Sequence, residues 1–176
     1  MSKNNKVLLG VTGSVAAYKA CELASRFVQK GYEVKTIMTS GALKFITPVT
    51  FRALTANSVY TDIFEEKNLH ISLGEWPDVI LIAPATASFI SKLASGLVSD
   101  LLTLTVISSQ AKVIICPAMN EIMYKNPIIQ ENIKRLQEVG YLFIGPYEGW
   151  LSCGYRGKGR LADIEDIIIK VEELLK

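Results

Sequence analysis

The chain has 176 residues, of which 49% are hydrophobic and 20% are charged, and its formal net charge is +2. The length fits one domain with its own hydrophobic core, and the composition excludes intrinsic disorder, which requires low hydrophobicity together with high net charge. Basic residues are spread along most of the chain, so nucleic acid is not the expected partner. We therefore expect a single domain over residues 1–176.

The chain begins with a short polar segment, Met1 to Lys6, that leads directly into an apolar run and has no features of a secretory signal. No apolar run approaches the roughly 20 residues that a membrane-spanning helix needs. The three cysteines are too few and too widely spaced for a disulfide framework. One histidine and no paired-cysteine spacing predict no metal site. We expect a cytoplasmic protein that does not contact membranes.

Patterns typical of strands and of helices alternate along the chain. Short apolar runs predict strands at 6–12, 33–39, 78–83, 112–116 and 141–144. Apolar residues at helical spacing predict helices at 14–30, 85–96, 99–109 and 127–139. Gly31 ends the first helix, and Asp163 is a good N-cap residue for a last one. Residues 145–162 are the one long segment without periodicity, as is typical of functional lids.

Strands that are apolar throughout and separated by helices indicate a parallel sheet covered on both faces. Five such strands predict an α/β fold with three αβα layers, a doubly wound sheet of the flavodoxin-like or Rossmann-like kind. In these sheets ligands bind at the carboxyl ends of the strands, near the point where the strand order reverses. The residues that follow each strand are therefore the candidate site.

The turn after the first strand contains Gly13, Ser14 and Val15. Gly13 allows a tight turn, Ser14 can cap the next helix, and the exposed N–H groups there would suit a phosphate. The spacing is not GxGxxG, and no acidic residue ends the second strand to hold a ribose. A mononucleotide therefore fits better than a dinucleotide. An ordinary strand-to-helix turn also accounts for these residues.

Small, hydroxyl and amide residues follow the other strands. They are Thr39, Ser40 and Gly41 after the second strand, 83–88 (APATAS) after the third and 117–123 (PAMNEIM) after the fourth. Such residues hold a ligand through backbone and hydroxyl groups. Serine, histidine and aspartate are not arranged as in a hydrolase elbow, which excludes that class of enzyme.

Three residues near these strand ends have both a structural and a functional explanation. His70, the single histidine, is a candidate general base because histidine titrates near neutral pH, but a surface-loop histidine is the alternative. Asn120 can bind a ligand or cap a helix after Pro117, and Met123 can line a site or fill the core.

Cys153 differs in context from the other two cysteines, which lie in the first helix and at the end of a buried strand and are expected to be inert. It belongs to residues 152–160 (SCGYRGKGR), whose three glycines favour a mobile or sharply turned segment. Nearby Arg156, Lys158 and Arg160 would lower the pKa of its thiol and attract an anionic substrate. A flexible basic loop with an incidental cysteine is the alternative.

Five segments taken together resemble the homo-oligomeric flavin-containing cysteine decarboxylases. The segments are 13–17 (GSVAA), His70, 83–87 (APATA), 117–123 and Cys153-Gly154. The resemblance extends over residues 6–165, and Pro-x-Met-Asn-x-x-Met is its most specific motif. It implies that FMN is held at a subunit interface, in a homotrimer or in trimers assembled into a dodecamer.

The resemblance also implies a role for each matching residue. The implied FMN contacts are Gly13, Ser14, Val15, Thr39, Gly41, Thr86, Ala87, Ser88, Phe89 and Ala118. His70 is the implied active-site base, and Asn120 the group that binds the substrate carboxylate, with Met123 beside the flavin. Cys153 is the implied residue of a substrate-covering flap that donates a proton late in the reaction. Arg156 is a candidate contact for the substrate.

The implied reaction removes the carboxylate of a cysteine moiety. Oxidation of the CH2–SH group to a thioaldehyde places the carboxylate beta to a C=S bond, so that loss of CO2 delivers electrons into sulfur as an enethiolate. Reduction of the enethiol then gives the thiol product without net redox change. Within the family, the Cys153-Gly154 pair favours phosphopantothenoylcysteine, a small substrate of coenzyme A biosynthesis, over a peptide.

The sequence departs from the family pattern in two places. Ser88 replaces the usual asparagine and has a shorter reach. The chain also ends at Lys176 without the synthetase domain of many bacterial relatives, which predicts a separate synthetase.

Three alternative functions remain. The first alternative is a peptidyl-cysteine decarboxylase of lantibiotic maturation. The second, a flavin prenyltransferase, would leave the Asn120 motif and Cys153 unexplained. The third is a non-catalytic flavin-binding regulator, which generally carries long acidic extensions.

Overall fold

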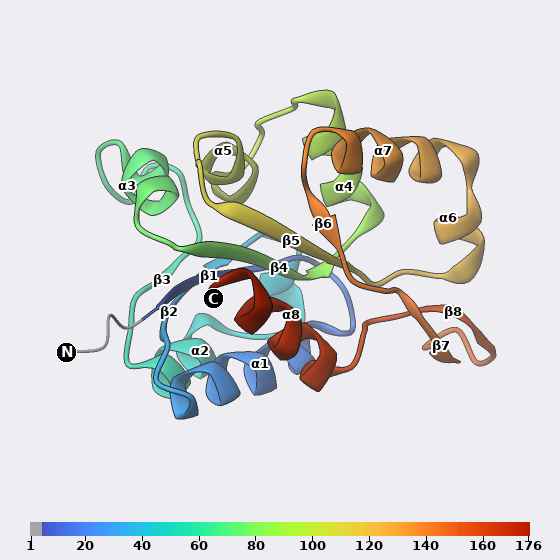
Figure 1. The fold of residues 1–176 in the computed structure, drawn as a ribbon, viewed down its shortest axis with the longest axis horizontal. Coiled ribbons are helices and arrows are strands. Elements are labelled where there is room, and N and C mark those ends of the chain that lie inside the picture. Colours follow the sequence, from blue (N-terminus) through green and yellow to red (C-terminus); the bar gives the residue numbers. More distant parts are fainter. Residues whose placement is uncertain (1–4) are drawn as a thin grey trace.

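The computed structural model describes residues 5–176. Its centre is a six-stranded parallel sheet with helices on both faces (Figure 1). The start of the chain, on which the expectation about a secretory signal rests, lies largely outside the described residues. The strand order is β3-β2-β1-β4-β5-β6. The strands are β1 (Lys6–Val11), β2 (Glu33–Met38), β3 (Val59–Tyr60), β4 (Val79–Ala85), β5 (Lys112–Pro117) and β6 (Leu142–Phe143). The predicted doubly wound α/β fold is confirmed.

The helices form the two outer layers. On one face lie α1 (Ala17–Gln29), α2 (Pro48–Thr55) and α8 (Ile164–Leu174). On the other face lie α3 (Leu69–Glu75), α4 (Ala87–Ser95), α5 (Leu101–Ile107) and α7 (Pro127–Glu138). A short helix, α6 (Glu121–Lys125), precedes α7, and a 3-10 turn, η1 (Ala42–Lys44), follows β2. No helix within residues 5–176 is long and apolar enough to cross a bilayer.

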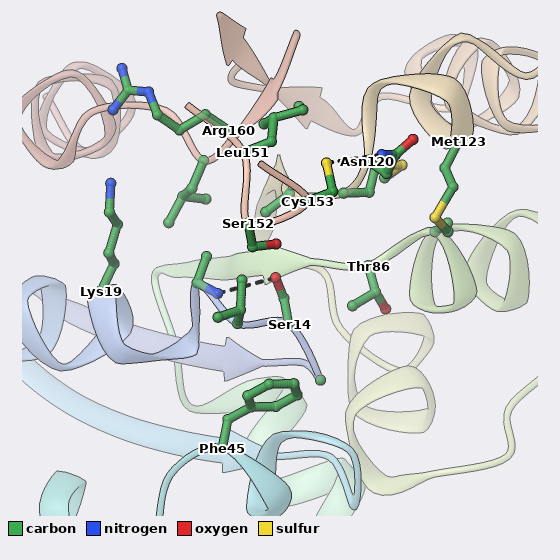
Figure 2. A pocket seen from close by; sticks show the side chains of 18 of the residues that line it. Ser14, Lys19, Phe45, Thr86, Asn120, Met123, Leu151, Ser152, Cys153 and Arg160 are labelled. Carbon is green, nitrogen blue, oxygen red and sulfur yellow. Dashed lines mark hydrogen bonds between the residues drawn. The ribbon is translucent and has the colours of Figure 1, made fainter. Parts of the chain in front are cut away.

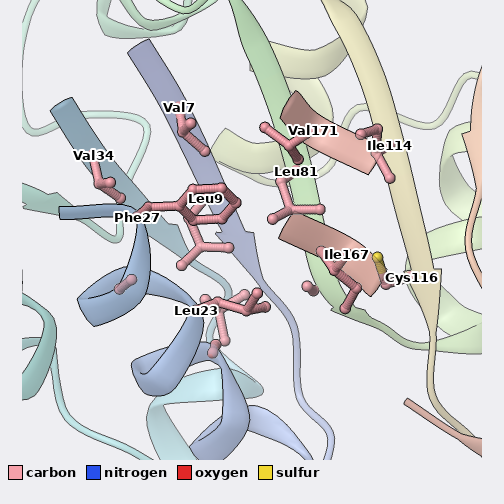
Figure 3. Close-up of a cluster of buried hydrophobic side chains, with 14 of the residues drawn as sticks. Val7, Leu9, Leu23, Phe27, Val34, Leu81, Ile114, Cys116, Ile167 and Val171 are labelled. Carbon is pink, nitrogen blue, oxygen red and sulfur yellow. The ribbon is translucent and has the colours of Figure 1, made fainter. Parts of the chain in front are cut away.

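The central strands β1, β4 and β5 are apolar over most of their length because each face of the sheet has its own core. Successive residues of a strand point to opposite faces. Leu9 and Leu81 therefore belong to the cluster beneath α1 and α8, together with Phe27 (Figure 3). Leu8 and Ile80, their immediate neighbours, belong to the cluster beneath α3, α4, α5 and α7. This double burial is what the uniform hydrophobic runs indicated.

The segment 145–162, predicted to be without regular structure, contains an antiparallel hairpin of β7 (Tyr147–Trp150) and β8 (Arg156–Arg160). The buried positions of its two strands are glycines: Gly149 in β7, and Gly157 and Gly159 in β8, where Arg156 and Lys158 are exposed. Buried and exposed residues alternate as in a strand, but the buried residues are glycines, so a hydrophobicity pattern does not detect the alternation. We call residues 147–160 the flap hairpin.

Further elements escaped the sequence patterns, among them β3 and the helices α2, α3 and α6. The edge strand β3 has only two residues, and α2 begins with proline and has eight. At helix starts, α1 begins at Ala17 rather than at Ser14, although the Ser14 hydroxyl accepts the Ala16 N–H at 3.3 Å. Asp163 is the N-cap of α8 by position, but its carboxylate accepts bonds from Arg160 at 2.7 and 3.3 Å instead of capping the helix.

Candidate active site

The strand order reverses between β1 and β4, because the chain proceeds from β1 to β2 and β3 on one side and from β4 to β5 and β6 on the other. Thr12 joins the carboxyl ends of these two strands. Its buried hydroxyl donates to the Pro84 carbonyl at 2.7 Å and accepts the Thr86 N–H at 3.0 Å. Ligand sites of doubly wound sheets lie at this point.

A cavity of about 690 Å³ opens beside this junction, within the size range of cofactor and substrate sites (Figure 2). Its walls come from the turn after β1, the start of α4, the segment after β5 and the flap hairpin. The predicted site residues that line it are Gly13, Ser14, Val15, Thr86, Ala87, Ser88, Ala118, Asn120, Met123 and Cys153. The structure thus brings most of the predicted residues together.

The turn after β1 contains a glycine pair in close approach. A Cβ atom on Gly13 would lie 2.9 Å from the Gly41 Cα, closer than packed atoms tolerate. Gly41 and Thr39 therefore lie directly behind the turn, although neither lines the cavity. The N–H groups of Gly13 and Val15 have no acceptor within residues 5–176 and remain available to an anion.

Replacing Gly13 with alanine is expected to weaken FMN binding by at least about tenfold. The added methyl group must push the turn away from Gly41, which moves the free N–H groups. Titration of the purified protein with FMN, followed by quenching of flavin fluorescence, measures the affinity. Thermal unfolding of the flavin-free variant provides the control for folding. Unchanged affinity would show that this turn does not hold the flavin.

The first residues of α4 face two ways, some toward the cavity and others toward the hydrophobic core. Thr86 is the N-cap, and its hydroxyl accepts the Phe89 N–H at 3.3 Å. Ala87 and Ser88 line the cavity, whereas the Phe89 side chain is 3% exposed and lies in the core. Phe89, a predicted flavin contact, therefore does not line the cavity, and its N–H is already bonded to Thr86.

Asn120 and Cys153 are in contact across the cavity. Asn120 is the N-cap of α6, and its Oδ1 accepts the Ile122 N–H at 2.8 Å. Its Nδ2 therefore faces the cavity, where it donates to the Cys153 Sγ at 3.3 Å (Figure 2). The same Nδ2 donates to the Tyr155 Oη at 2.9 Å. The capping role and the site position of Asn120 coexist. Met123 lines the cavity and is 49% exposed, so it is not core filler.

His70 does not join these residues within one chain. It is half-buried on α3, a helix rather than the loop that was the alternative, and it is not among the cavity-lining residues. Leu69 and Leu73 anchor α3 in the core near α5. Figure 1 shows α3 at the opposite end of the molecule from α6 and the flap hairpin.

The three cations near Cys153 in the sequence contact other groups. Arg160 lines the cavity and pairs with Asp163. Lys158 extends its ammonium over the Tyr124 ring, 5.6 Å from its centre. Arg156, a predicted substrate contact, is exposed outside the cavity lining, with Glu148 at 3.9 Å.

The other two cysteines are less suited to thiolate chemistry. Burial raises the pKa of both Cys116 and Cys21, which disfavours their reactive thiolates. No cluster of histidine, cysteine, aspartate or glutamate within residues 5–176 could hold a metal ion.

Several cavity residues had no distinct sequence signal. They include Lys19, Phe45, Trp150, Leu151 and Ser152. Lys19 lies in the first turn of α1, four residues after Val15, which precedes the helix, and no sequence pattern marks it as a site residue. Phe45 and Trp150 are 54% and 70% exposed, but only the structure shows that these aromatic side chains border a cavity.

The chain belongs to the Flavoprotein family, whose model matches residues 1–176. Over 98% of its length it is 49% identical to the coenzyme A biosynthesis bifunctional protein CoaBC of Bacillus subtilis, but it spans only 44% of that protein. It is 41% identical to a probable phosphopantothenoylcysteine decarboxylase of Streptococcus mutans, with 97% of this chain and 98% of that one covered. The resemblance found in the sequence is confirmed.

Solved structures agree with this assignment. A cysteine-to-serine mutant of PPC decarboxylase complexed with pantothenoylaminoethenethiol has a TM-score of 0.87 and 29% identity, with 98% of this chain and 99% of that chain covered. The FMN-dependent cysteine decarboxylase SpaF has a TM-score of 0.85 and 32% identity, with 98% of both chains covered.

Proposed function

We propose that this protein is an FMN-dependent carboxy-lyase that converts phosphopantothenoylcysteine to phosphopantetheine in coenzyme A biosynthesis. The observation that carries the proposal is the contact between Asn120 and Cys153 in a cavity at the sheet's switch point. The relatives named phosphopantothenoylcysteine decarboxylase and CoaBC support the same substrate. Coenzyme A biosynthesis from a small phosphorylated substrate also supports a cytoplasmic location.

The residues at the switch point suit FMN. Gly13, Ser14 and Val15, with Thr39 and Gly41 behind them, would hold the phosphate and ribityl chain through free N–H groups and hydroxyls. The remaining flavin contacts would come from Thr86, Ala87, Ser88 and Ala118, which line the cavity. When bound, FMN would supply the two-electron oxidation of the substrate CH2–SH group and the return of those electrons after CO2 is lost.

The chain's own residues would bind, orient and exchange protons with the substrate. Asn120 Nδ2 would hold the carboxylate, in place of its contact with Cys153, and keep the breaking bond aligned with the C=S group. Met123 would pack beside the flavin and substrate. His70 would accept the proton released when the thiol is oxidised. Cys153 would donate a proton to a carbon atom of the enethiol when the enethiol is reduced.

A second copy of the chain would complete the site. His70 is not a cavity residue of its own chain, so a catalytic His70 must come from a neighbouring subunit. Val15, Phe45, Met123 and Trp150 expose apolar surface around the cavity, which a neighbouring subunit would cover. These features fit the homotrimer, alone or assembled into a dodecamer, that the family resemblance implies.

The decisive experiment is release of CO2 from phosphopantothenoylcysteine by the purified, FMN-loaded protein. We expect phosphopantetheine as the product and no requirement for an external reductant, because the reaction has no net redox change. A peptide with a C-terminal cysteine, supplied in parallel, tests the alternative peptide decarboxylase. Turnover of the peptide alone would replace the proposed substrate, and turnover of neither would favour a flavin-binding regulator.

A further inference from the structure

The base of the flap hairpin is pressed against the segment that carries Asn120. The Met119 N–H donates to the Gly159 carbonyl at 3.0 Å. Gly159 approaches so closely that a Cβ there would clash with the Met119 carbonyl oxygen. Backbone therefore packs on backbone at this point, and no side chain of residue 159 separates the two segments.

Glu121, the first residue of α6, adds a side-chain contact to this junction. Its side chain is 24% exposed, and its Oε1 accepts the Lys158 backbone N–H at 3.1 Å and lies 3.0 Å from the Lys125 ammonium. Gly157 leaves room for it, because a Cβ on Gly157 would lie 2.8 Å from Oε2. Glu121 thus fills the space that Gly157 leaves open, beside the Met119 backbone that packs on Gly159.

The charge state of Glu121 suits a permanent contact. The Lys158 N–H, and after it the Lys125 ammonium, lower the pKa of the Glu121 carboxyl below its ordinary value. A carboxyl whose pKa is lowered by folding contributes stability above its ordinary pKa and loses it only as the pH falls through the lower value. Glu121 therefore remains an ionised acceptor throughout the neutral range.

The turn of the flap hairpin links β8 to Cys153, so the position of the strand sets the position of the thiol. The Leu151 N–H donates to the Tyr155 carbonyl at 2.9 Å, and the Gly154 N–H donates to the Leu151 carbonyl at 3.0 Å. These bonds close the turn that carries Cys153. Beyond the turn, Asn120 Nδ2 contacts both the Cys153 thiol and the Tyr155 hydroxyl. Helix α6 therefore holds the hairpin at its base through Glu121 and at its tip through Asn120.

We propose that Glu121 is a positioning residue that fastens the flap hairpin to α6 and so keeps the Cys153 thiol at the Asn120 amide. The inference deepens the proposed function and rests on it for the catalytic consequence. When the substrate carboxylate takes the place of Cys153 on Asn120, the tip contact is lost. The Glu121 contact then keeps the hairpin over the cavity, with Cys153 in reach for the late proton transfer.

The test compares Glu121→Ala and Glu121→Gln with the wild-type holoenzyme. Glutamine retains an acceptor for the Lys158 N–H and is the conservative rescue, and Glu131→Ala on the exposed surface of α7 is the matched control. Alkylation of Cys153 by iodoacetamide, followed by mass spectrometry of its peptide, and hydrogen exchange of the Lys158 amide report on the hairpin without turnover. The ratio of enethiol to thiol product reports on proton donation.

In Glu121→Ala we expect Cys153 alkylation and Lys158 exchange to rise roughly threefold to tenfold, the range that loss of one hydrogen bond produces. The share of enethiol should rise while CO2 release and FMN affinity stay unchanged, and Glu121→Gln and Glu131→Ala should resemble wild type. Unchanged alkylation and exchange in Glu121→Ala would overturn the proposal, as would an equal effect in Glu131→Ala. If the wild type releases no CO2, the proposed function is wrong, and alkylation and exchange still decide whether Glu121 fastens the hairpin.

Discussion

Replacing Cys153 with serine is expected to separate the two halves of the reaction. CO2 release in a first turnover should remain within about threefold of wild type, because Asn120 and the cavity are unchanged. Formation of the reduced thiol should fall by ~10²–10⁴, the usual contribution of a positioned general acid. The serine hydroxyl is far less acidic than a thiol and donates a proton poorly, so the oxidised enethiol should accumulate.

A single-turnover reaction without oxygen, analysed by mass spectrometry, measures this outcome as the ratio of enethiol to thiol product. Cys21→Ser is the matched control, since Cys21 lies half-buried on α1 and is not among the cavity residues. The pantothenoylaminoethenethiol bound to a cysteine-to-serine mutant of PPC decarboxylase is an enethiol of the expected kind. Thiol product formed at the wild-type rate would remove Cys153 from the mechanism.

Replacing His70 with asparagine is expected to lower the rate of CO2 release by ~10²–10⁴, because the variant would lack the base proposed to take the thiol proton. FMN should remain bound with wild-type affinity, since His70 is not among the residues of its own chain that line the cavity proposed to hold FMN. The measurement is the release of CO2 beside the flavin content of the purified variant. Normal turnover by the variant would show that His70 is not the base.

A mixed assembly tests whether His70 acts across a subunit interface. His70→Asn and Asn120→Ala subunits, each inactive alone, are refolded or co-expressed together with different affinity tags. A site that takes His70 from one copy and Asn120 from another is intact in about a quarter of random pairings, because each copy must be of the right kind. Recovery near that fraction supports the shared site, and no recovery in a confirmed mixed oligomer would show that each site uses one chain.

Much of the fold could be predicted from the sequence because burial on both faces of a parallel sheet requires uninterrupted runs of apolar residues. Segments such as 79–83 and 113–116 are apolar at every position because α-helices cover both sides of the sheet. The turn at Gly13 and the Asn120 segment were also recognisable, since sharp turns and helix caps require particular residue types. All of these are local properties, which depend on neighbours in the sequence.

The flap hairpin was missed for the opposite reason. Gly157 and Gly159 are buried because Glu121 and the Met119 backbone occupy the space beside them. A hydrophobicity pattern reflects the side chain of each residue. The burial of these two glycines depends instead on a segment distant in the sequence that packs against them. The two-residue strand β3 is likewise defined by its pairing with β2 rather than by its own sequence.

The sequence by itself determined the sheet, its two cores and the residue types of the candidate site. Only the tertiary structure decided that Asn120 and Cys153, 33 residues apart, share a hydrogen bond, and that His70 lies away from both. Contacts between distant segments follow from the packing of whole elements, which no local pattern encodes. For the same reason, Cys153 acquires a defined position only through the hairpin that carries it and the helix on which that hairpin rests.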